Sequence, residues 1–402
     1  MSTIEDRLRA ELKRMTDQAQ PGQLRPLRVP GRRRDRRRWL LPAGAIATVG
    51  ALIAVALVLV TAPRVNLRAA SPPSGGMPHY YATVREYSIS TLQVVVHDSV
   101  TGKVTGADTM PLDAATPPVT ETVAAAPDDR TFYITAAESA PQNYVSSYDY
   151  RLFRVRISAD GRPGPVAELP EVIGPGALAP EGMGLSPDGK LLAISLAFFP
   201  GLAEPGVQGG LQVIDLATGA SRSWTTGNDA KDWPGTPVWV GGDRVLAFPW
   251  WHLSSAAVGR RVPAVRLLDI AAPGSDLLSS RVVPVGSVSG LTSSALVTSD
   301  GRGIVEAICR DHPQGEWQGT ETILITEQPL GTGVPRVLLS RTEHYRNVNG
   351  GPAFNESCAV LSADPSGQHV LVHAFGLGRI DHGVFTALPD VQLDEVYGEA
   401  AW

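Results

Sequence analysis

The chain has 402 residues and a formal net charge of -5 that is divided unevenly along its length. Residues 1–38 hold 12 Lys and Arg against 5 Asp and Glu, a net of +7, so the remainder carries -12. An acidic main domain argues against nucleic-acid binding there. The short arginine-rich run has no fold of its own and does not predict nucleic-acid binding at the amino terminus either.

The basic segment 1–38 begins with a helix signal. Ser2 and Glu5 have the spacing of a capping box, which precedes an apolar helical face. That face is formed by Ile4, Leu8, Leu12 and Met15. We expect this helix either to dock onto a cytoplasmic protein or to lie on the lipid surface, because amphipathicity alone does not separate the two.

Residues 39–63 form an uncharged, mostly aliphatic run directly after six arginines between Arg32 and Arg38. As a helix the run would extend about 36 Å, enough to cross a hydrocarbon core of ~30 Å. It is longer than the apolar region of a cleaved signal peptide, and Pro63 directly follows the small-residue candidate cleavage site. We therefore predict a single-pass signal anchor in the cell membrane, with the arginines on the cytoplasmic side.

After a Pro/Gly/Ser linker at 64–78, the pattern from 79 to 402 is that of an all-β extracytoplasmic domain. Short apolar, β-branched runs alternate with Gly, Pro and Asp turns, and no long helical period interrupts them. The clearest runs are 92–97, 131–135, 191–196, 211–215, 245–248, 265–269, 304–309, 322–326 and 370–374.

The turns recur in two interleaved series. One series has acidic members at Asp128, Asp188, Asp243, Asp300 and Asp364, spaced 55 to 64 residues apart. The other has glycines at Gly102, Gly161, Gly219, Gly274, Gly331 and Gly383, spaced 52 to 59 residues apart. Each period thus holds two hairpins, which predicts a four-stranded propeller blade. Six turns of one kind and five of the other favour six blades, one of them completed by the tail 391–402; seven blades is the alternative.

These repeats resemble a known group. The segment Leu185-Ser-Pro-Asp-Gly-Lys-Leu-Leu-Ala-Ile194 resembles TolB-like and WD40-like propeller repeats. Segments 238–248 and 265–274, together with the arginine block and apolar run, are similar to actinobacterial single-pass membrane proteins that carry such propellers. The resemblance implies fold and topology but no activity, because propellers host many functions. The chain lacks the Trp-Asp strand ends of true WD40 repeats.

This arrangement also invites comparison with anti-sigma factors, which place a cytoplasmic helix before an exported sensor domain. Their zinc-binding subclass needs a His-x-x-x-Cys-x-x-Cys pattern before the membrane, and residues 1–38 contain neither His nor Cys. A zinc-free helix that docks to a sigma factor stays open as a hypothesis.

Trp250, Trp251 and His252 form the most unusual local cluster of the chain. One interpretation is an aromatic platform at the propeller mouth that stacks on a sugar or peptide ligand. The other, which aromatic side chains favour in general, is packing between blades with one ring exposed.

Two further groups of side chains raise chemical questions. His369 and His373 lie four apart in a predicted strand, about 13 Å from each other, too far for both to bind one metal ion. We expect structural roles for them and for His382. Cys309 and Cys358 are the only cysteines. They can form a disulfide in an oxidising compartment or remain free thiols.

Motifs for catalysis are missing from the sequence: there is no Gly-x-Ser-x-Gly elbow, no P-loop, no dinucleotide fingerprint and no calcium loop. We therefore expect no cofactor, no metal and no enzymatic activity. The predicted function is binding of an unidentified extracytoplasmic protein, peptide or glycan, with relay to a cytoplasmic partner. The alternative is an anchored cell-wall hydrolase or lyase with paired carboxylates in the propeller channel.

Overall fold

The structure is a computed structural model, and every residue it describes lies within the compact unit Asn66–Trp402. It describes residues 77–88, 91–110, 112, 118–138, 150–171, 173, 179–198, 208–227, 232–254, 259–286, 291–313, 318–331, 333–346, 358–364, 367–388 and 400–402. The predicted helix and partner-docking residues in 1–38, the predicted anchor at 39–63 and most of the linker lie outside these ranges. Within them, no helix is long and apolar enough to cross a membrane.

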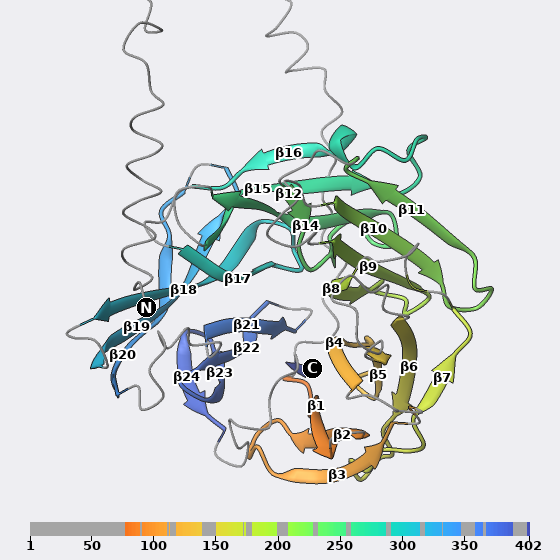
Figure 1. Cartoon of the computed structure of the whole chain (residues 1–402), viewed down its shortest axis with the longest axis horizontal. Coiled ribbons are helices and arrows are strands. Elements are labelled where there is room, and N and C mark those ends of the chain that lie inside the picture. The colour runs from red at the N-terminus through yellow and green to blue at the C-terminus, as the bar shows by residue number, and fades with distance from the viewer. Residues whose placement is uncertain are drawn as a thin grey trace, which may run out of the picture. The chain divides into compact units, whose positions relative to one another are not determined.

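The described strands form six antiparallel sheets arranged around a central axis, as Figure 1 shows. We call the strands of each blade a to d from the axis outward. The first blade contains β25 (Ala400–Ala401), β1 (Tyr80–Ser88), β2 (Thr91–Asp98) and β3 (Val104–Thr109). The second contains β4 (Pro118–Ala125), β5 (Thr131–Glu138), β6 (Tyr150–Arg156) and β7 (Ala167–Leu169). The third contains β8 (Ala179–Leu185), β9 (Leu191–Phe198), β10 (Gln208–Asp215) and β11 (Ser221–Thr225).

The fourth blade is irregular because its a strand is divided. Both β12 (Asp232–Pro234) and β13 (Val238–Trp239) pair with β14 (Val245–Ser254), which is followed by β15 (Gly259–Asp269), a short 3₁₀ helix (Leu277–Ser279) and β16 (Arg281–Pro284). The fifth blade contains β17 (Leu291–Val297), β18 (Gly303–Pro313), β19 (Gln318–Pro329) and β20 (Arg336–Arg346). The sixth contains β21 (Cys358–Ala363), β22 (His369–Ala374), β23 (Leu377–Asp381) and β24 (Val384–Ala387).

The two predicted turn series are the a–b turns and the c–d turns of the blades. In a meander of four antiparallel strands, the a–b and c–d turns lie at the same end of the sheet, so both series line one face of the ring. The recurring glycines of the c–d turns all have positive φ, as at Gly102 (φ 75°) and Gly219 (φ 71°). Glycine adopts this conformation without steric cost. The six-bladed prediction is confirmed, and the seven-bladed alternative is wrong.

Each blade buries both faces against its neighbours. Six apolar clusters occupy the interfaces between successive blades, the one between the first and second blades including Val94, Phe132 and Phe153, all 0% exposed. This packing is the physical reason for the repeat, since a single four-stranded sheet would leave two apolar faces in water.

The carboxyl-terminal strand closes the ring, as the unequal turn counts predict. β25 pairs with β1 through Ala82–Ala401 and Thr83–Ala400, and it becomes the a strand of the first blade. The seven-blade count fails for this reason: the tail completes the first blade and adds none of its own.

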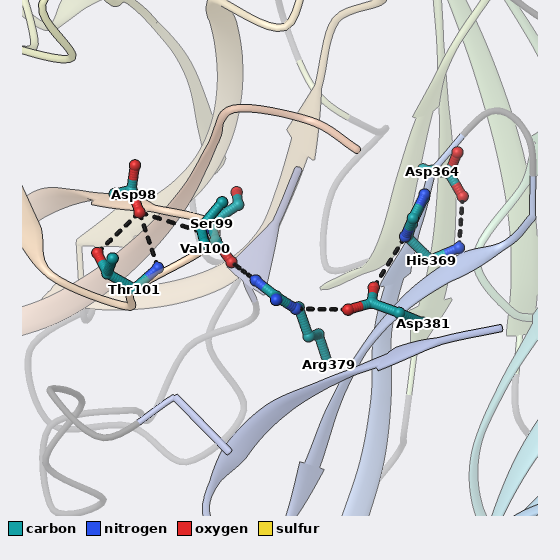
Figure 2. A network of polar contacts seen from close by, with 8 residues as sticks. All are labelled: Asp98, Ser99, Val100, Thr101, Asp364, His369, Arg379 and Asp381. Atoms are coloured by element: carbon teal, nitrogen blue, oxygen red, sulfur yellow. Dashed lines mark hydrogen bonds and ion pairs between the residues drawn. The ribbon is translucent and has the colours of Figure 1, made fainter. Parts of the chain in front are cut away.

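Side chains reinforce this closure between the sixth and first blades, as Figure 2 shows. Arg379 donates from Nε to Asp381 Oδ2 over 2.6 Å and from Nη1 to the carbonyl oxygen of Ser99. Asp381 Oδ1 is also 2.8 Å from Nδ1 of His369, which is 8% exposed. The carboxylate of Asp98 holds the receiving turn by accepting from the N–H groups of Val100 and Thr101.

Candidate functional site

A cavity of about 430 Å³ lies among the a strands of the blades. Every blade contributes to its wall, and it reaches the a–b turns at one face of the ring. Its lining consists of Pro78, Val123, Ala124, Ala125, Ala126, Pro127, Asp129, Met183, Gly184, Leu185, Pro187, Thr236, Pro237, Val238, Trp239, Leu296, Val297, Ser299, Leu361, Ser362, Ala363, Ala401 and Trp402. A mostly apolar cavity with a few polar groups is the usual form of a ligand site.

Close backbone contact between the third and fourth blades shapes one wall of this cavity. Between β12 and β13 the chain leaves the sheet at Gly235, Thr236 and Pro237, and this segment approaches β8. A Cβ at Gly184 would lie 2.1 Å from the carbonyl oxygen of Pro237, so only glycine fits there. Trp239 then donates from Nε1 to the carbonyl oxygen of Gly184 over 3.0 Å, which fixes its indole in the wall.

Asp129 is the charged member of the described lining. It occupies the a–b turn of the second blade with a φ of 56°, and its Oδ2 accepts from the backbone N–H of His79 over 2.8 Å. Its Oδ1 is buried without a hydrogen-bond partner. Burial away from water raises the pKa of this carboxyl above its ordinary value, because desolvation disfavours the charged form.

The described lining holds a single carboxylate. Glycoside hydrolysis generally needs two carboxylates placed on either side of the scissile bond. Among the described residues that line the cavity, Asp129 is alone as a carboxylate. The described part of the chain also contains no cluster of three or more His, Cys, Asp or Glu side chains arranged to hold a metal ion.

The predicted cluster at Trp250, Trp251 and His252 does not line this cavity. Trp250 and Trp251 are 4% and 5% exposed, and they point to opposite faces of β14, toward the third and fifth blades respectively. The predicted aromatic platform is therefore corrected to a packed pair, because a blade is covered on both faces and consecutive residues are both buried. His252 remains exposed and pairs with Asp232 over 2.6 Å, and Asp232 also accepts from Trp250 Nε1.

His369 of the sixth blade takes part in the ring closure through Asp381. His369 pairs with Asp381, and its ring meets that of His382 edge-on, with centroids 5.6 Å apart. His373 is buried at 9% exposure in the same strand. Cys309 in β18 and Cys358 in β21 form a disulfide, which connects the fifth blade to the sixth.

Asp129, Trp239 and Trp402 are the cavity residues that sequence reasoning does not select. A signal for Asp129 is nevertheless present: the other a–b turns place a left-handed glycine at the corresponding point, as at Gly189 and Gly301, whereas this turn reads Asp-Asp. Nothing local in the sequence marks the two tryptophans as axial, because that depends on which residues of each a strand face the centre.

Comparison with known proteins assigns neither a family nor a function to the chain. Neither a protein-family profile nor a curated protein sequence matches the chain. Among solved structures, hydrazine synthase of Kuenenia stuttgartiensis is 20% identical over 73% of this chain and 74% of its own, with a TM-score of 0.39.

Two further solved structures show a similarly low identity and TM-score. The periplasmic gluconolactonase PpgL of Pseudomonas aeruginosa is 14% identical over 80% of this chain and 97% of its own, with a TM-score of 0.35. The β-propeller domain of the Trilobed protease of Pyrococcus furiosus is 13% identical over 71% and 76%, with a TM-score of 0.34. At these identities and TM-scores, no function and no residue role is transferred to this chain.

Proposed function

We propose that the protein is a membrane-anchored, non-enzymatic binding protein whose extracytoplasmic propeller takes a protein, peptide or glycan ligand. The anchor rests on the sequence: six arginines next to an uncharged run of membrane-spanning length. Ligand binding rests on one structural observation, the axial cavity of about 430 Å³ with a mostly apolar wall and a single described carboxylate.

The alternative of a cell-wall hydrolase or lyase has less support. It requires a second carboxylate or a metal ion near Asp129, and the described lining supplies neither. The anchor and the binding activity are independent parts of the proposal, because the cavity would bind its ligand with or without the anchor. Each part therefore needs its own test.

The anchor is tested by topology. We expect alkaline phosphatase fused after Trp402 to be active in intact cells and a fusion after residue 38 to be inactive. The opposite pattern would contradict the proposed orientation.

Binding is tested with the full-length protein in detergent, applied to arrays of envelope peptides and glycans. We expect retained spots that disappear when Ser362→Phe narrows the cavity. The control is Val337→Phe in the outermost strand of the fifth blade, where the side chain is 57% exposed. If both variants lose all spots, or if both keep them, the result would argue against binding in the cavity.

Relay to the cytoplasm is a separate part of the proposal and rests on the apolar face of Ile4, Leu8, Leu12 and Met15. A sigma factor is the partner class that the arrangement suggests. We expect a pull-down with the peptide 1–38 to recover a cytoplasmic protein, and the same peptide with Leu8→Asp and Leu12→Asp to lose it. Recovery of lipid vesicles alone would favour the membrane-surface interpretation.

A further inference from the structure

A second cavity, of about 480 Å³, lies between the fifth and sixth blades, where their a–b and c–d turns meet. Val305, Val370 and Ile380 contribute buried aliphatic side chains to its wall, whereas Arg302 and Arg336 contribute exposed charged ones. The cavity shares no described lining residue with the axial cavity. It is therefore a separate place at which a ligand can bind.

Arg302 occupies a position that recurs in the blades. Its carbonyl oxygen accepts from the backbone N–H of Leu330 over 2.7 Å, just as the carbonyl oxygen of Arg244 accepts from Ile270 over 3.0 Å in the fourth blade. These backbone contacts align the blades residue by residue. The aligned position is basic in the second to fifth blades, at Arg130, Lys190, Arg244 and Arg302.

In the second, third and fourth blades, the charged group at this position has a partner within its own blade. Arg130 donates to the carbonyl oxygen of Ser158, Lys190 pairs with Asp188, and Arg244 donates to both carboxylate oxygens of Asp269. Arg302 differs: within the part of the chain that the structure describes, its backbone N–H is bonded but its guanidinium makes no hydrogen bond or ion pair.

A single change in the repeat explains this difference. Pro329 precedes Leu330 as Asp269 precedes Ile270, so a proline stands where the fourth blade has the carboxylate that binds its arginine. The next acid along β19 is Glu327, and it accepts from Nε and Nη2 of Arg336 over 3.0 and 2.5 Å. The guanidinium of Arg302 is thereby left at the cavity without a described counterion.

The other polar side chains of the lining leave this positive charge in place. Asp300 accepts from the hydroxyl of Thr298 over 2.7 Å and from the backbone N–H of Arg302 over 2.9 Å, which are contacts within the turn itself. From the sixth blade, His382 adds an exposed imidazole. Two guanidinium groups and an imidazole beside an aliphatic wall are suited to an oxyanion that carries an apolar body.

We propose that the cavity between the fifth and sixth blades binds the oxyanion of a small organic phosphate or carboxylate. The oxyanion accepts from Arg302 and from the Nη1 side of Arg336, and the apolar part of the ligand lies against Val305, Val370 and Ile380. This inference does not depend on what the axial cavity binds, because the two sites are separate.

The test measures binding to the full-length protein in detergent by isothermal titration calorimetry, at low ionic strength because salt screens exposed charges. The probes are phenyl phosphate, benzoate and benzyl alcohol, which share a benzene ring. We expect at least one of the two anions to bind about tenfold or more tightly than the alcohol, since hydrogen bonds to charged groups are the stronger ones. Tighter binding of phenyl phosphate identifies a phosphate as the source of the oxyanion, and tighter binding of benzoate identifies a carboxylate. Equal affinity for all three probes, or no heat with any of them, would overturn the proposal.

Arg302→Gln removes the guanidinium that has no described partner. Glutamine stands at the aligned position of the sixth blade, as Gln368, so the fold accepts it there. We expect about a tenfold loss of affinity for the anion that binds. Arg244→Gln is the matched control, because it removes the same charge at the aligned position of the fourth blade, and we expect it to bind like the wild type. Equal losses in both variants would show an effect of net charge alone and would contradict the site.

Pro329→Asp tests the site without removing Arg302. It restores the carboxylate that the fourth blade has at this position, at a residue that is exposed. We expect it to weaken anion binding as much as Arg302→Gln does, because the new carboxylate occupies the guanidinium and repels the ligand. Pro329→Asn adds a side chain of the same size without charge and should keep the affinity. Wild-type affinity in Pro329→Asp, with urea unfolding curves that show all variants folded, would overturn the assignment of Arg302 to the site.

Discussion

Arg379 of the sixth blade donates a hydrogen bond to the carbonyl oxygen of Ser99 in the first blade, across the junction where the ring closes. The same guanidinium is paired with Asp381, which in turn holds His369. A single side chain thus joins the c strand of the last blade to the c–d turn of the first. The junction also contains the two-residue strand β25 and a buried apolar cluster.

Replacing Arg379 with alanine should open this junction. The change leaves Asp381, whose side chain is 21% exposed, without its cation, and it leaves the Ser99 carbonyl without its donor. We expect the free energy of unfolding to fall by about 2–3 kcal/mol in urea denaturation.

The matched control is Arg336→Ala, which breaks the pair with Glu327 at a side chain that is 65% exposed. We expect a loss of no more than about 1 kcal/mol there, because exposed pairs contribute little. Equal losses in the two variants would show that the closure contact has no special weight.

Glu306 makes stability depend on pH. It is 3% exposed between the fourth and fifth blades, where Gln328 and Thr292 donate to it, and burial raises its pKa from 4.5 to about 7. The folded protein therefore binds this proton more tightly than the unfolded chain does. The contribution favours folding at low pH and is lost progressively as pH rises from 4.5 to about 7.

We expect Glu306→Gln to remove this dependence. Between pH 5.5 and 8 the wild-type protein should lose about 2 kcal/mol more in free energy of unfolding than the variant does. The measurement is urea denaturation across that range, with Glu327→Gln at the exposed pair as the control. Parallel pH profiles for wild type and Glu306→Gln would contradict the assignment.

The disulfide between Cys309 and Cys358 should contribute measurably, because it closes a loop with a sequence separation of 49 residues. Loop-closure entropy gives about 4 kcal/mol for such a loop, and measured effects are typically ~2–4 kcal/mol. Dithiothreitol should lower the free energy of unfolding of the wild type by this amount. It should leave the Cys309→Ser, Cys358→Ser double variant unchanged, and an equal response of both proteins would exclude the bond as the cause.

Gly184→Ala should damage the cavity wall. The added methyl group would lie 2.1 Å from the carbonyl oxygen of Pro237, so backbone must move, and we expect a loss of about 1–3 kcal/mol. Gly164→Ala places its methyl 3.3 Å from the carbonyl oxygen of Arg156 and should cost less. Thermal unfolding of the two variants gives the comparison; a smaller loss for Gly184→Ala would show that the two blades separate easily there.

The fold is readable from sequence because its turns are chemically specific. Asp and Gly recur wherever the chain reverses, and the excess of one c–d turn over the a–b turns already requires the tail to complete a blade. The structure bears out both inferences, with β25 beside β1. The division of the fourth blade's a strand could not be foreseen, since Gly235 and Pro237 also suit an ordinary turn.

The candidate site is far less readable. Trp250 and Trp251 stand out in the sequence but are buried, because both faces of a blade are covered. Asp129 is inconspicuous among the acidic turn residues. It lies at the cavity only because the closed ring brings β4 together with β8, β17 and β21. Local sequence patterns specify turns and strands, whereas the cavity forms only when all six blades have assembled into the ring.

The pairing of β1 with β25 also means that the first blade is completed late in synthesis. Thr83 pairs with Ala400, which is incorporated 317 residues later. At about 5–20 residues per second, synthesis of that interval takes roughly 16–60 seconds. During this time the edge of β1 that will pair with β25 has unpaired backbone N–H and C=O groups, which can form hydrogen bonds with a strand of another chain. A nascent chain that lacks β25 would therefore expose this edge to chaperones or proteases. The edge is covered once β25 has been synthesised and has paired with β1.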